Sequence, residues 1–183
     1  MRRLFAILFT SFLSASAWAE AGLNDYAVRL DKLFAELHGN LDETTSKLIE
    51  VQIWSVWANE STPEAVAQLA EASSAMNAGA FDVAEKKLIA IVQAHPDFAE
   101  AWNRRATLYF MQGRYEESLA DISHVLDLEP RHFGALSGKG MVLRAQGKPA
   151  EALRAMKDAL EINPYAAGLK DSVERLEKMN PEL

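Results

Sequence analysis

The side chains best suited to acid–base or metal chemistry are the four histidines, His38, His95, His124 and His132. They lie on different predicted elements, and His95 and His132 adjoin positions where helices meet at prolines, which favours capping or turn roles. The chain contains no H-E-x-x-H pattern, no G-x-S-x-G pattern and no phosphate-binding G-x-x-x-x-G-K loop. It also contains no cysteine, which excludes disulfides and thiolate-bound metals. The sequence therefore predicts no catalytic residue, no metal site and no cofactor, and we expect a protein that is not an enzyme.

The charge of the chain also excludes one class of partner. Its 183 residues carry 19 basic and 26 acidic side chains, which gives a net charge of −7. Proteins that bind nucleic acid through its phosphates concentrate lysine and arginine instead. We therefore expect no nucleic-acid partner and no attraction to an anionic membrane surface.

The N-terminal segment has the three-part order of a secretory signal peptide. A basic start at Arg2 and Arg3 precedes ten largely apolar residues, 4–13, and small residues follow at Ala17 and Ala19. Ten residues rise only about 15 Å as a helix, which is too short to span a bilayer as an anchor. The sequence predicts that residues 1–19 are removed by cleavage after Ala19. The mature chain would then lie in the periplasm with no stable membrane anchor.

A repeat of 34 residues organises the rest of the chain. Pro96, Pro130 and Pro164 are 34 residues apart, and the segments they define are 65–98, 99–132 and 133–166. Equivalent positions hold the same kind of residue in all three segments. These are glycine at Gly79, Gly113 and Gly147, small residues at Ala72, Ala106 and Gly140 and at Ala84, Ser118 and Ala152, and apolar residues at Leu88, Ile122 and Met156.

Each segment is predicted to form two helices. Apolar residues recur at helical spacing on both sides of the glycine, as at Trp102, Ala106 and Tyr109. The glycine is expected to end the first helix and the proline the second. Asp97 and Glu100 have the spacing of a capping box at the start of a helix. The spacing predicts a stack of helical hairpins.

These segments resemble the tetratricopeptide repeat (TPR), whose 34-residue pattern is W-x2-L-G-x2-Y, A-x3-F and P. The middle segment has Trp102, Ala106, Tyr109, Ser118, Ile122 and Pro130 in these positions, although the usual leucine is replaced by Arg105. The resemblance implies an all-α solenoid of three repeats over residues 63–166 that binds a protein or peptide. The chain is also similar to periplasmic repeat proteins of Gram-negative bacteria associated with cell-envelope integrity.

Two flanking segments are expected to complete the array. Residues 20–62 are predicted to form a helical hairpin, and residues 167–183 a capping helix and tail. The apolar stripe of the second hairpin helix, about residues 43–60, includes Trp54 and Trp57. One interpretation is that the hairpin seals the first repeat. The other is that Trp54 and Trp57 anchor a partner or a second copy of the chain.

In the TPR family the first helices of successive repeats line a concave groove. The resemblance assigns the groove to Ser73, Met76, Asn77, Asn103, Arg104, Thr107, Phe110, Met111, Ser137, Met141 and Arg144. Either Arg104 and Arg144 grip a partner carboxylate, or each pairs with a neighbouring acidic residue on an adjacent helix. We expect a scaffold for envelope proteins or, alternatively, a chaperone-like binder of unfolded outer-membrane or secreted chains. An enzyme or enzyme regulator would need a titratable cluster, which the sequence does not show.

Overall fold

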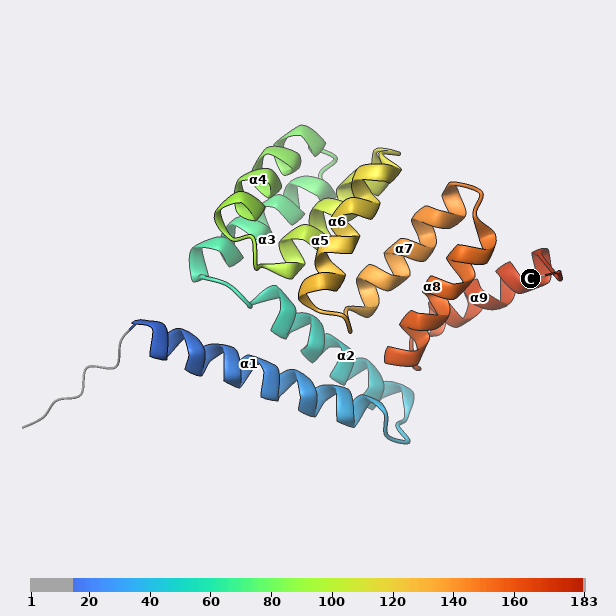
Figure 1. The fold of residues 1–183 in the computed structure, drawn as a ribbon, viewed down its shortest axis with the longest axis horizontal. Coiled ribbons are helices and arrows are strands. Elements are labelled where there is room, and N and C mark those ends of the chain that lie inside the picture. Colours follow the sequence, from blue (N-terminus) through green and yellow to red (C-terminus); the bar gives the residue numbers. More distant parts are fainter. Residues whose placement is uncertain (1–14, 183) are drawn as a thin grey trace, which may run out of the picture.

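The structure is a computed structural model that describes the backbone of residues 15–182 and the side chains of residues 25–166 and 168–182. Within this range the chain forms helices and no strand, which confirms the predicted all-α fold (Figure 1). The helices are α1 (Ala15–Leu37), α2 (Glu43–Ala58), α3 (Pro63–Asn77), α4 (Phe81–Ala94), α5 (Ala99–Met111), α6 (Tyr115–Leu128), α7 (Phe133–Ala145), α8 (Pro149–Ile162) and α9 (Ala167–Met179). Residues 1–14 of the predicted signal peptide lie outside the described range.

The predicted repeat appears as three antiparallel helix pairs, α3–α4, α5–α6 and α7–α8 (Figure 1). The turn inside each pair contains Gly79, Gly113 or Gly147, with φ of 72°, 74° and 73°. This left-handed conformation strongly favours glycine, which explains why the residue recurs every 34 positions. The second helices end two residues before Pro96, Pro130 and Pro164, as predicted.

The small residues of the repeat allow close contact between paired helices. A Cβ atom on Gly140 would lie 2.5 Å from Cγ of Met156 and 3.1 Å from the backbone oxygen of Ala152. In the preceding pair, the Ser118 hydroxyl donates a hydrogen bond of 2.8 Å to the backbone oxygen of Ala106. Helices α7 and α5 thus pack directly on the helices that follow them.

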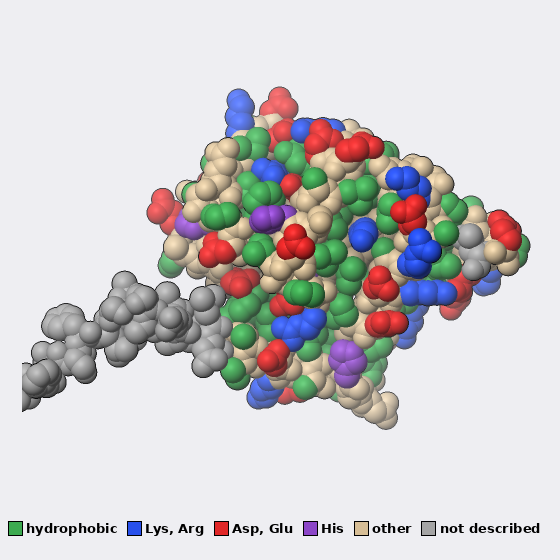
Figure 2. All heavy atoms as spheres, in the orientation of Figure 1, with side chains coloured by type: hydrophobic (Ala, Val, Ile, Leu, Met, Phe, Trp, Pro, Cys, Tyr) green, Lys and Arg blue, Asp and Glu red, His purple; other side chains and the backbone are tan. Residues whose placement is uncertain are grey.

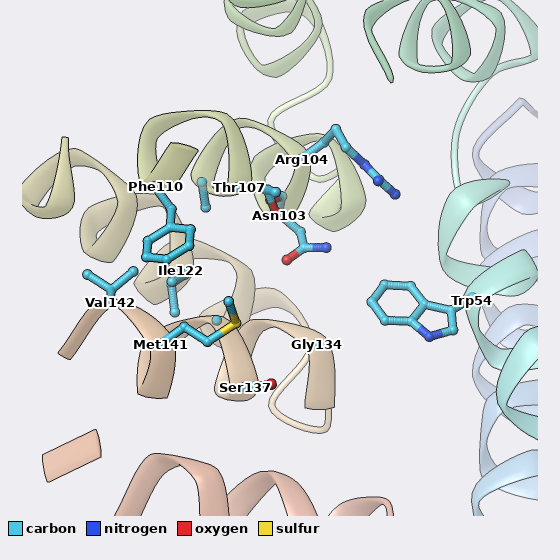
Figure 3. Close-up of a pocket in the computed structure, with 12 residues that line it drawn as sticks. Trp54, Asn103, Arg104, Thr107, Phe110, Ile122, Gly134, Ser137, Met141 and Val142 are labelled. Carbon is cyan, nitrogen blue, oxygen red and sulfur yellow. The ribbon is translucent and has the colours of Figure 1, made fainter. Parts of the chain in front are cut away.

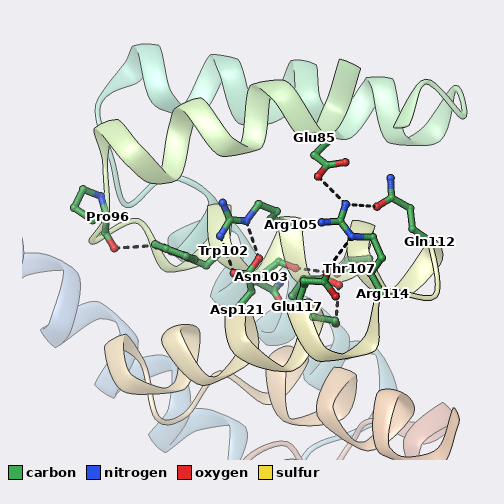
Figure 4. Close-up of polar contacts among 12 residues, drawn as sticks. Glu85, Pro96, Trp102, Asn103, Arg105, Thr107, Gln112, Arg114, Glu117 and Asp121 are labelled. Carbon is green, nitrogen blue, oxygen red and sulfur yellow. Dashed lines mark hydrogen bonds and ion pairs between the residues drawn. The ribbon is translucent and has the colours of Figure 1, made fainter. Parts of the chain in front are cut away.

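Arg105 occupies the usual leucine position of the repeat and forms a buried ion pair in place of an apolar contact. Its guanidinium donates two hydrogen bonds of 2.8 Å to the carboxylate of Asp121 on α6 (Figure 4). The same group lies 4.8 Å from the ring centroid of Trp102 and 5.6 Å from that of Tyr109. Arginine can pair with a carboxylate through two hydrogen bonds and can also pack on aromatic rings, and these contacts replace the apolar packing of the usual leucine.

The N-terminal hairpin does not seal the first repeat, so that prediction is wrong. Its buried residues, among them Leu30, Ile53 and Trp57, form one apolar cluster with Phe133, Leu136 and Ala159 of α7 and α8. A connection of four residues, 59–62, joins α2 to the first repeat. In the view of Figure 1, helix α2 begins near α8 and runs beneath α7 and α5 to the first repeat. The hairpin therefore packs on the third repeat, across the stack.

Polar contacts along the hairpin reinforce this docking. The Tyr165 hydroxyl accepts a hydrogen bond of 2.9 Å from the Leu41 backbone N–H and donates one to the backbone oxygen of Gly39. Further contacts join Arg131 to Asp31 at 2.6 Å, Asn163 to Glu50 at 3.2 Å, and the His38 ring to the Glu161 backbone oxygen at 3.0 Å. The hairpin helices and the turn between them are thus tied to α8 and to the loops that flank α7 and α8.

The C-terminal helix α9 also covers part of the last repeat. Val173 and Leu176 of α9 are buried against Leu153 and Met156 of α8. Among the described residues, no helix is long and apolar enough to cross a membrane.

Candidate peptide-binding site

A buried polar cluster lies where the hairpin meets α5 and α7. The side chains of Glu100 and His132 are both fully buried. The Ala135 backbone N–H donates to Nδ1 of His132 at 3.1 Å, so the ring proton lies on Nε2, which donates to Glu100 at 3.3 Å. One face of the same imidazole ring stacks on the Trp57 indole, with ring centroids 4.0 Å apart and an angle of 9° between the ring planes.

Glu100 is held as a carboxylate by its neighbours. It accepts hydrogen bonds from the side chains of Asn103, at 2.8 Å, and Arg104. Burial favours the neutral acid, but the hydrogen bond from His132 and the charge of Arg104 outweigh it, so the pKa of Glu100 lies below its usual value. The predicted capping box is wrong, because no side chain caps the start of α5 and Glu100 points into this cluster.

Beside this cluster, α5 and α7 enclose a pocket of about 270 Å³, whose third wall is Trp54 of α2 (Figure 3). Its floor is apolar and includes Phe110, Ile122 and Val142. Thr107 and Ser137 add hydroxyl groups from opposite helices. The remaining lining residues are Asn103, Arg104, Ala106, Gly134, Gly138 and Met141.

Trp54 reaches the pocket because α7 has no side chain at Gly134. A Cβ atom at this position would lie 2.3 Å from Cη2 of Trp54 and 2.9 Å from Cζ2. The indole is fixed on its other side by edge-on contacts with Trp57 and Phe133, with ring centroids 5.2 and 5.4 Å apart. A side chain of the hairpin is therefore built into the concave surface of the repeats.

Gly134 and Gly138 provide a matched test of this arrangement. We expect Gly134→Ala to lower the free energy of unfolding by about 1–3 kcal/mol, since the new methyl group must displace a packed indole. A Cβ atom on Gly138 would meet only Cδ1 of Ile122, at 3.7 Å. Gly138→Ala should therefore raise stability by up to about 1 kcal/mol through helix propensity. Chemical denaturation of the two variants measures both effects, and equal stabilities would contradict the position of Trp54.

The structure brings together about half of the groove residues expected from the sequence. Asn103, Arg104, Thr107, Phe110, Ser137 and Met141 line the pocket. Ser73, Asn77, Met111 and Arg144 do not, and Met76 is buried in the core of the first repeat. The expectation that Met76 lines a groove is wrong, because its side chain packs between α3 and α4.

Trp54 and Trp57 have different roles in the structure. Trp57 has no exposed surface, so it cannot anchor a partner or a second copy of the chain. Trp54 is half-buried and lines the pocket. It is the residue of this pair that a partner could touch.

Five lining residues were not among the predicted binding residues, namely Ala106, Ile122, Gly134, Gly138 and Val142. A signal for two of them was present. Gly134 and Gly138 lie four residues apart on one face of a helix, where glycine costs stability unless close packing requires it.

The two groove arginines differ in their surroundings. Arg104 pairs with Glu100 on its own helix, whereas the second interpretation expected an acidic partner on an adjacent helix. Arg144 is exposed near the end of α7, away from the pocket. On the face drawn in Figure 2, acidic and basic side chains are interspersed, with no broad area of one sign. Among the described residues, no group of three or more histidine and acidic side chains could hold a metal ion.

Comparisons with known proteins agree with this architecture. Two family models described as tetratricopeptide repeat match residues 69–127 and 133–166. A TPR repeat-containing protein of Rhizobium etli is 36% identical over 148 residues, which cover 81% of this chain and 72% of that protein. DnaJ homolog subfamily C member 3 of Rattus norvegicus is 33% identical over 49% of this chain but only 18% of its own length.

Solved structures show the same fold at lower sequence identity. The first TPR of Spaghetti bound to an HSP90 peptide superposes with a TM-score of 0.61 at 18% identity, covering 65% of this chain and 94% of that one. The Sgt2 TPR domain from Aspergillus fumigatus gives 0.62 at 20% identity, covering 66% and 82%. This chain belongs to the tetratricopeptide repeat family, whose fold is typical of scaffolds for protein–protein interaction.

Proposed function

We propose that the mature chain is a periplasmic scaffold that binds a protein of cell-envelope biogenesis or integrity through the pocket between α5 and α7, without catalysing a reaction. The observation that carries this proposal is the pocket itself. It has an apolar floor beneath exposed or half-buried polar groups, and it lies on the concave surface where repeat stacks bind their partners.

The site offers contacts but no reactive group. Glu100 and His132, the closest approach to a titratable pair, are fully buried beneath Trp57 and bound to their neighbours. A substrate could not reach either group. The groups that remain accessible are hydroxyl, thioether and aromatic side chains and the partly exposed guanidinium of Arg104, which suit the recognition of a peptide.

One solved structure with the same fold is bound to an HSP90 peptide, which supports a peptide as the kind of ligand that this chain binds. The two proteins share only the fold, at 18% identity, so the sequence of that peptide is no guide to the partner of this chain. A periplasmic location rests on the signal-peptide pattern of residues 1–19. Cleavage after Ala19 would not remove the described apolar contacts of α1, because these begin at Tyr26.

Export is tested by intact mass. We expect protein recovered from the periplasm to begin at Glu20. Full-length chain recovered with the membrane fraction would contradict cleavage and favour an N-terminal anchor.

Partner binding is tested by photo-crosslinking in cells. A photoreactive amino acid at Met141, on the rim of the pocket, should capture one folded envelope protein, identified by mass spectrometry. The same amino acid at Val83, which is 49% exposed on α4 and outside the pocket, is the matched control. Equal capture at the two positions would contradict the site. Capture of many unrelated unfolded chains at Met141 would instead favour the chaperone-like alternative.

A further inference from the structure

The N-terminal hairpin occupies part of the concave surface as a fixed element. Trp57 and Ile53 have no exposed surface and share one core with Phe133 and Leu136 of α7. Hydrogen bonds and ion pairs from α1, α2 and their connecting loop also hold the hairpin in place. Its removal would expose a hydrophobic core, so the surface of α7 beneath it is closed to a partner.

The hairpin leaves only a short part of the concave surface of α5 and α7 open. Trp54 fills the space over Gly134 at the start of α7. Beyond this ring lie Thr107 and Ser137, and then Phe110 and Met141, which is 39% exposed (Figure 3). A peptide that crossed α7 at Gly134 would clash with the indole.

The volume of the open pocket sets the size of what it can hold. At about 270 Å³ it lies just below the range of about 300–1,000 Å³ that cofactor and drug-sized ligand sites occupy. The pocket can therefore hold one large amino-acid side chain.

The lining also selects the chemistry of that side chain. Phe110, Ile122, Val142 and the Trp54 indole offer apolar surface. The cation of Arg104 is already paired with Glu100, and the Asn103 amide donates to the same carboxylate. The hairpin, whose interface adjoins the pocket, places Trp57 and Ile53 on this same part of the stack. The side chains that the chain itself packs beside the pocket are therefore large and apolar.

Resting on the proposed peptide-binding function, we propose that the partner is held by a short segment that inserts one aromatic or large aliphatic side chain against Trp54. The N-terminal hairpin is then part of the binding site. It shortens the groove of the repeats to one pocket, and it supplies the wall that the anchoring side chain touches.

Selection from a phage-displayed library of random linear peptides tests this proposal. We expect peptides enriched on the wild-type mature chain to share one aromatic or large aliphatic position, with alanine there abolishing binding. Gly138→Leu should fill the pocket from its floor and weaken a selected peptide at least tenfold. Lys139→Leu introduces the same side chain at an exposed neighbouring position outside the pocket, and should leave affinity unchanged. If Gly138→Leu does not fold, Thr107→Trp fills the pocket from its exposed wall.

The outcomes separate this inference from the function on which it rests. Peptides that bind but ignore the pocket-filling variants, or that need Ser73 and Asn77 of the first repeat, would overturn the single-pocket inference and leave peptide binding in place. Failure to enrich any peptide would overturn both. A dimer in sedimentation that Gly138→Leu dissociates would place a second copy of the chain in the pocket, and would overturn the assignment to a foreign segment.

Discussion

Replacing Trp57 with alanine is expected to lower the free energy of unfolding by about 3–5 kcal/mol. The indole has no exposed surface, stacks on His132 at 4.0 Å and lies 5.0 Å from the Phe133 ring, measured between centroids. Its removal leaves a cavity between α2 and α7 that neighbouring rings can fill only in part. Chemical denaturation followed by far-ultraviolet circular dichroism measures the loss.

The control for this variant is Leu48→Ala on the same helix. Leu48 is 59% exposed, so its truncation should change stability by no more than about 0.5 kcal/mol. Similar losses for the two variants would show that α2 is not packed by its tryptophan face against the third repeat.

Glu100→Gln is the second variant for which we expect a large effect, a loss of about 1.5–3 kcal/mol at neutral pH. The glutamine cannot carry the charge that compensates Arg104, and the hydrogen bonds to a buried carboxylate are replaced by weaker ones, while water still solvates part of the Arg104 cation. Glu64→Gln, an exposed replacement on α3, is the control and should leave stability nearly unchanged.

The effect of Glu100→Gln should depend on pH with a definite sign. The pKa of Glu100 is lower in the folded chain than its usual value of 4.5, so the unfolded state binds this proton first as pH falls. The stabilisation is complete above pH 4.5 and is lost as pH falls below it through the folded pKa. The stability difference between wild type and Glu100→Gln should therefore shrink in acid. A difference that stays constant or grows below pH 4.5 would contradict an ionised Glu100.

The repeats could be predicted because their signals are local. Gly113 ends α5 through its own φ, and Pro130 lies two residues after the end of α6, so spacing alone identifies both. The position of the hairpin could not be predicted in this way. Trp57 meets His132 and Phe133, which lie more than 70 residues away in sequence and come close only through the curvature of the stack.

The same limit applies to the candidate site. The family pattern located Phe110 and Met141, because both lie on first helices of repeats. It did not locate the wall formed by Trp54, which comes from outside the repeats. Glu100 was misassigned to a cap because a carboxylate three residues after Asp97 has the same spacing whether it turns towards the helix start or into a core.

The N-terminal hairpin is proposed to form part of the binding surface of the repeats. Nuclear Overhauser effects from the Trp54 ring protons, measured in the mature chain bound to a selected peptide, test it most directly. We expect cross-peaks to the α protons of Gly134 and to the apolar anchoring side chain of the peptide. A bound peptide that gives no cross-peak to Trp54, or a Trp54 ring that gives none to Gly134, would contradict the claim.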